Sequence, residues 1–165
     1  MNYYQPNRWV RLRCFALIAL QFALWPIPGP AQFPLAPPTT PQAQHNALLS
    51  VRSQVDWFIN STRTATNYGE QGYGNVWQMF QGLRQSYFAL KQTLNPQQLA
   101  YGANNLADLD AGLDIIEEGF SNYQQDVAEG RQPGMALQAM CRVMRQAIGL
   151  WLQELNKTSF QLRIG

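Results

Sequence analysis

The fold is decided by the stretch VWQMFQGLRQSYFALKQTL, residues 76–94, where large apolar side chains recur after four, three, four, three and four residues. These side chains are Val76, Phe80, Leu83, Tyr87, Leu90 and Leu94. Because an α-helix has about 3.6 residues per turn, this spacing places them all on one face. The stretch therefore predicts an amphipathic helix, and Asn75 is the expected N-cap.

The same spacing recurs in three further segments, about 42–66, 96–129 and 133–156. Thr40 and Pro41 are suited to the N-cap and first position of the first of these helices. The sequence Asn95-Pro96-Gln97-Gln98 predicts a capping box that starts the segment 96–129. This segment is either one continuous helix or is kinked or split near its start by Gly102 and the pair Asn104-Asn105. In each segment the recurring apolar side chains form a row on one face of the helix, which we call its apolar seam. The seams of these three segments are Leu48, Val51, Val55, Phe58, Thr62 and Ala65; Leu106, Leu109, Leu113, Ile116, Phe120, Tyr123 and Val127; and Leu137, Cys141, Met144, Ile148, Trp151 and Leu155.

Four amphipathic helices with short connections predict an all-α fold, an up-down-up-down four-helix bundle spanning residues 42–158. The alternative is a three-helix core in which residues 42–66, whose seam is weakest, pack loosely. Residues 68–75 are rich in glycine and predict a flexible connection. Residues 159–165 are expected to form a C-terminal tail on the surface of the bundle.

The N-terminus has the pattern of a signal peptide. Three arginines (Arg8, Arg11 and Arg13) precede an apolar run, residues 14–25, that is too short to cross a bilayer. We expect a signal peptide over residues 1–31, cleavage after Ala31, and a proline-rich linker over residues 32–41. An uncleaved anchor is the alternative. Export would place the mature protein in a periplasm, a thylakoid-type lumen or the extracellular space, without a transmembrane span.

The composition of the chain argues against nucleic-acid binding. The chain has 165 residues, enough for one ordinary domain, and its mature part would carry nine basic and ten acidic residues. Nucleic-acid binding domains need a strongly basic face, so a nucleic-acid partner is not expected.

The residues that common catalytic and metal sites require are scarce. His45 is the only histidine, and the sequence has neither a Cys-x-x-Cys-His haem motif nor a Glu-x-x-His di-iron motif. Cys141 lies on an apolar seam, which indicates a buried thiol. The sequence therefore predicts no catalytic residues, no metal and no cofactor.

Residues 96–129 hold an unusual concentration of acidic residues. No Lys or Arg lies between Lys91 and Arg131, and none of the acids is on the apolar seam. The simplest interpretation is a solvated face without a specific role. Of the two functional alternatives, docking of a basic partner is favoured over weak cation binding by Asp110, Asp114 and Glu117. The seven acids are Asp108, Asp110, Asp114, Glu117, Glu118, Asp126 and Glu129.

A second group of candidate residues surrounds the glycine-rich stretch. Tyr68, Tyr73 and Trp77 would place aromatic surface at one end of the bundle, and Trp57 also lies off its apolar seam. The predicted partner-binding set consists of the aromatic residues Tyr68, Tyr73 and Trp77 and the acidic residues Asp110, Asp114, Glu117 and Glu118. The sequence thus favours an exported, non-enzymatic bundle that binds another protein or a membrane-associated assembly. The alternative is a small-ligand carrier, in which Gly112 and Gly119 make room between the helices.

Overall fold

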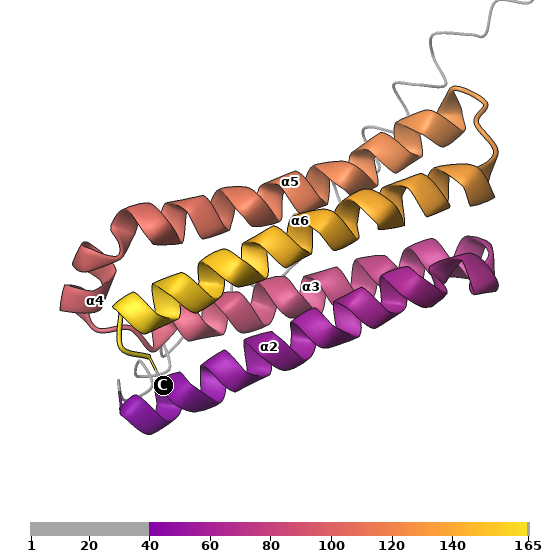
Figure 1. Cartoon of the computed structure of the whole chain (residues 1–165). Helices are drawn as coiled ribbons and strands as arrows, with labels where there is room; N and C mark the ends of the chain where they lie inside the picture. The colour runs from indigo at the N-terminus through magenta and orange to yellow at the C-terminus, as the bar shows by residue number, and fades with distance from the viewer. Residues whose placement is uncertain (1–39, 165) are drawn as a thin grey trace, which may run out of the picture. The chain divides into compact units, whose positions relative to one another are not determined.

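The computed structural model describes residues 40–164, and this part of the chain is helical without strands (Figure 1). The prediction of an all-α fold is confirmed. The expected signal peptide and nearly all of the proline-rich linker lie outside the described residues. The elements are α2 (Pro41–Thr64), the 3-10 helix η1 (Ala65–Tyr68), α3 (Glu70–Gln92), α4 (Pro96–Tyr101), α5 (Ala103–Ala128) and α6 (Pro133–Gln161).

The four long helices contribute to one apolar core. Every residue of the four predicted seams is buried except Tyr123 and Val127, which are half-buried near the end of α5. The seam of α2 is as well buried as the others, with Val51, Val55 and Phe58 fully enclosed. This burial contradicts the alternative in which residues 42–66 pack loosely.

The helices make their closest backbone contacts in two pairs, α2 with α3 and α5 with α6 (Figure 1). Between α3 and α5 the contacts are made by long side chains. Trp77 of α3 packs edge-on against Phe120 of α5, with 4.8 Å between ring centroids. Two ion pairs, Arg84 with Glu117 and Lys91 with Asp110, also join these helices.

Several predicted helix boundaries are confirmed. The Thr40 side chain accepts a hydrogen bond from the Ala43 N–H, and Pro41 occupies the first turn of α2. Asn95 and Gln98 form the capping box of α4. The predicted segment 96–129 is split at Gly102, which ends α4 and precedes α5.

The prediction of a flexible connection over residues 68–75 is wrong, and so is Asn75 as N-cap. η1 continues directly from α2, and α3 begins at Glu70 after Gly69, whose φ of 56° favours glycine. Gly72 then lies against the backbone of Ala65, where a Cβ atom would overlap the carbonyl group. The two glycines therefore permit a tight reversal.

The C-terminal end of α6 also differs from the expectation. The helix continues to Gln161 instead of ending near Asn156, and Leu162 and Ile164 are buried in the core. Gln98 donates a hydrogen bond to the Leu162 carbonyl at 2.8 Å, and Gln44 of α2 donates to Gln98 at 2.7 Å. Hydrogen bonds thus tie the chain end to α4 and α2.

Among residues 40–164, no helix combines the length and the apolar character that crossing a membrane requires.

Candidate functional site

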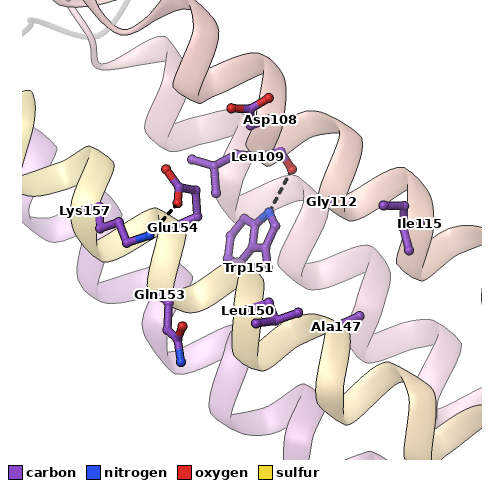
Figure 2. A pocket seen from close by; sticks show the side chains of 10 residues that line it. All are labelled: Asp108, Leu109, Gly112, Ile115, Ala147, Leu150, Trp151, Gln153, Glu154 and Lys157. Carbon is purple, nitrogen blue, oxygen red and sulfur yellow. Dashed lines mark hydrogen bonds and ion pairs between the residues drawn. The ribbon is translucent and has the colours of Figure 1, made fainter.

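A groove of about 380 Å³ runs along the surface between α5 and α6 (Figure 2). Its volume lies within the range of ordinary ligand sites. The groove has an apolar floor, two apolar walls and one polar end.

The floor of the groove is organised by Trp151 of α6. Its indole N–H donates a hydrogen bond to the carbonyl of Leu109 on α5 at 2.8 Å, drawn as a dashed line in Figure 2. A Cβ atom on Gly112 would lie 2.8 Å from Cδ1 of the indole, so glycine is needed for the ring to fit. Tyr87 of α3 also packs edge-on against Trp151, at 5.4 Å between centroids. Trp151 is therefore held in place by contacts with both α5 and α3.

The walls of the groove are large apolar side chains that water can reach. Ile115 of α5 is 61% exposed and Leu150 of α6 is 68% exposed, with Ala147 beside Leu150 (Figure 2). Such side chains beside a concave apolar floor are typical of a surface that docks a partner.

The polar end of the groove holds charges of both signs. Lys157 donates to Glu154 at 3.1 Å, and Asn105 donates to the same carboxylate at 3.4 Å. Asp108 also lines the groove, and it has no salt-bridge partner among the described residues. The end of the groove therefore offers one carboxylate that a cationic group could reach.

Two of the four acidic residues in the predicted partner-binding set form ion pairs with other residues of this chain. Glu117 pairs with Arg84 at 2.6 Å, and Asp110 pairs with Lys91 at 2.7 Å. Sequence reasoning missed these partners because they come from α3, on a different segment.

Asp114 and Glu118 are exposed and have no salt bridge to a described residue. Asp114 lines a cavity of about 180 Å³ between α3 and α5, which lies beside both ion pairs and the exposed ring of Phe88. No three described His, Cys, Asp or Glu side chains are placed to hold a metal ion.

The three predicted aromatic residues do not form one patch. Tyr73 stacks on Tyr123 at 4.7 Å, and Trp77 is half-buried against Phe80 and Phe120. Burial raises the pKa of Tyr73 above its ordinary value. Tyr68 is exposed and lies with Trp57 in a separate cleft. The predicted partner-binding set therefore does not form a single surface.

The other groups considered for chemistry are placed as follows. Cys141 is buried, as its position on the seam predicts, and burial raises the pKa of its thiol. A raised pKa keeps a thiol protonated and poorly nucleophilic. His45 is half-buried in the second turn of α2.

The sequence contains a signal for the groove that lies outside the apolar seams. Ile115 and Leu150 are large apolar residues just beside the seam residues Ile116 and Trp151, so they lie outside the core face. Gly112, which the carrier alternative uses to make room for a ligand, lies against the ring of Trp151, and this contact supports close packing of the helices. Gly119 likewise lies against Met144, where a Cβ atom would be 3.1 Å from Cε.

Comparison with protein-family models, with curated proteins and with solved structures finds no match for this chain.

Proposed function

We propose that this chain is an exported, non-enzymatic, up-down-up-down four-helix bundle that binds another protein or assembly at an extracytoplasmic membrane face. The observation that carries the proposal is the groove between α5 and α6. It exposes Ile115 and Leu150 over an apolar floor, beside the carboxylate of Asp108, which forms no salt bridge with a described residue. Burying such apolar walls against a partner removes them from water, which is the main favourable term in association.

The charge of α5 supports the same proposal. Asp108 and Glu118 lie seven residues before and three residues after Ile115, so helical periodicity places them on the same outer side. A partner with an apolar ridge and basic flanks would match both features. Electrostatic complementarity of this kind mainly sets orientation and the rate of encounter.

The small-ligand alternative has weaker support in the space between the helices. The cavity lined by Thr158, Leu162 and Ile164 has about 10 Å³, roughly the room one water molecule needs. The groove between α5 and α6 is large enough for a small molecule, so the experiment that follows also distinguishes a small-ligand carrier.

The test is photo-crosslinking in the native host, with the crosslinking amino acid placed at Leu150. Asp56, exposed on α2, is the matched control position. We expect one identified partner protein to be captured at Leu150, not at Asp56, and to be lost when Ile115→Gln is added. Equal capture at both positions would contradict the proposal. A small molecule that copurifies in stoichiometric amount, without capture, would support the carrier.

A further inference from the structure

A second concave site, of about 340 Å³, lies at the end of the molecule where α2 turns through η1 into α3. It is independent of the groove and of the proposed function. Its position follows from the tight reversal at Gly69 and Gly72, which brings the first turns of α3 against the last turns of α2.

Two aromatic side chains in this cleft are unusually open to water. Trp57 of α2 is 54% exposed and Tyr68 of η1 is 56% exposed. Neither ring belongs to the core, and among the described residues neither packs against another aromatic ring. Each residue therefore leaves more than half of its surface open to a ligand, and its ring is available for stacking.

The remaining polar groups of the cleft are neutral. The side-chain hydrogen bonds of the described residues use neither the Asn60 amide nor the Asn75 amide. Ser61 and Thr64 donate their hydroxyl protons to backbone carbonyls, at 2.7 Å to Phe58 and 3.1 Å to Asn60, which leaves their lone pairs as acceptors. None of the described side chains that line the cleft is charged.

This combination selects one class of ligand. A pyranose ring has a face of C–H groups, slightly positive, that stacks on the negative face of an aromatic ring. Its hydroxyls both donate and accept, as amides and serine or threonine hydroxyls do. Phosphates and other anions would need cationic partners, and a purely apolar ligand would leave the amides unpaired.

We propose that the cleft between α2, η1 and α3 binds an uncharged oligosaccharide. Trp57 and Tyr68 supply the stacking surfaces, and Asn60 and Asn75 supply the hydrogen bonds that orient the sugar.

The test measures binding of N-acetylchitotriose, cellotriose and maltotriose to the purified protein, by saturation-transfer NMR and tryptophan fluorescence. We expect at least one trisaccharide to bind, with saturation transferred to its ring C–H groups. Trp57→Ala and Tyr68→Ala should each weaken that binding at least tenfold. The control Phe88→Ala removes an equally exposed ring from α3, away from the cleft, and should leave binding unchanged.

A spectrum of the unmodified protein gives an independent readout. The indole N–H resonance of Trp57 should shift on titration, while those of Trp77 and Trp151 stay in place. The proposal is overturned if none of the three sugars binds at millimolar concentration, or if binding survives both alanine substitutions. Binding of a proline-rich peptide in place of sugar would also overturn it. None of these results bears on the groove, whose test uses Leu150 and Ile115.

Discussion

Tyr87 shows how one side chain links the core to the surface. Its hydroxyl donates to the Leu106 carbonyl at 3.3 Å, its ring packs on Trp151, and Lys91 lies 5.6 Å from the ring centroid. Burial, and then the nearby carboxylate of Asp110, raise its pKa well above the ordinary value of a tyrosine. The folded protein therefore holds this phenol neutral where an unfolded chain would ionise it.

This shift predicts a loss of stability at alkaline pH. Below the unfolded pKa of about 10 the contribution is fully present, and it falls as pH rises above that value because only the unfolded state loses the proton. Tyr87→Phe should flatten the decline in unfolding free energy above pH 10, measured by urea denaturation. An equally steep decline in the variant would show that other groups cause it.

Gly112 and Gly149 form a matched pair of glycines within helices. A Cβ atom on Gly112 would lie 2.8 Å from Trp151, whereas nothing lies within 4 Å of one on Gly149. Gly112→Ala should cost about 1 to 3 kcal/mol of unfolding free energy through overpacking. Gly149→Ala should gain up to about 1 kcal/mol, because alanine favours the helix. Thermal melts followed by circular dichroism measure both, and equal effects would contradict the assigned packing.

At the scale of the elements, helices are joined by a small polar cluster at one end of the molecule. Gln44 of α2 is buried and donates to the Thr93 carbonyl at 2.9 Å and to Gln98 at 2.7 Å. Gln98 in turn holds the Leu162 carbonyl. One glutamine pair thus connects α2, the end of α3, α4 and the C-terminal residues.

Gln44→Ala should lower the unfolding free energy by about 1 to 3 kcal/mol, because it removes the buried side-chain donor of the Thr93 carbonyl. The control is Gln42→Ala on the exposed side of α2, where only a bond to Asn46 is lost. It should change stability by less than about 0.5 kcal/mol. Equal losses in urea denaturation would show that the cluster is not a stabilising feature.

The elements also show what sequence patterns could predict. Periodicity located all four seams, and side-chain chemistry located the caps at Thr40 and Asn95, because both signals are local. The early start of α3 accompanies the close approach of Gly72 to the backbone of Ala65 across the reversal, and the late end of α6 accompanies the contact of Leu162 with the distant Gln98. Local patterns do not contain such contacts.

The candidate site was less predictable for the same reason. The acidic character of α5 was visible in the sequence, but the partners of Asp110 and Glu117 lie on α3. The groove forms between two helices, and a sequence pattern within one helix does not show that Ile115 of α5 and Leu150 of α6 line the same groove.

At the scale of the whole molecule, the proposed export makes a direct prediction. The exported protein should begin at or near Gln32, and intact-mass measurement of the form recovered outside the cytoplasm checks this. A full-length species held in the membrane would show that residues 14–25 act as an anchor.

The distribution of charge leads to the last prediction, which concerns the partner. The carboxylates of Asp108, Asp114 and Glu118 have no salt bridge among the described residues, whereas Glu117 is paired with Arg84. Like charges one turn apart cost a few tenths of a kcal/mol in an exposed helix. The double variant Asp108→Asn, Glu118→Gln should therefore keep or slightly raise thermal stability, while it slows association with a basic partner.

The slowing should be largest at low salt, where charges are least screened, and stopped-flow or surface-binding kinetics would measure it. Glu117→Gln is the control: it should cost less than about 1 kcal/mol of stability, as partly exposed ion pairs do, and leave association unchanged. If the double variant melts much earlier, these carboxylates stabilise the fold. If association is slowed equally by Glu117→Gln, the partner contacts the α3 side of α5 instead of the groove.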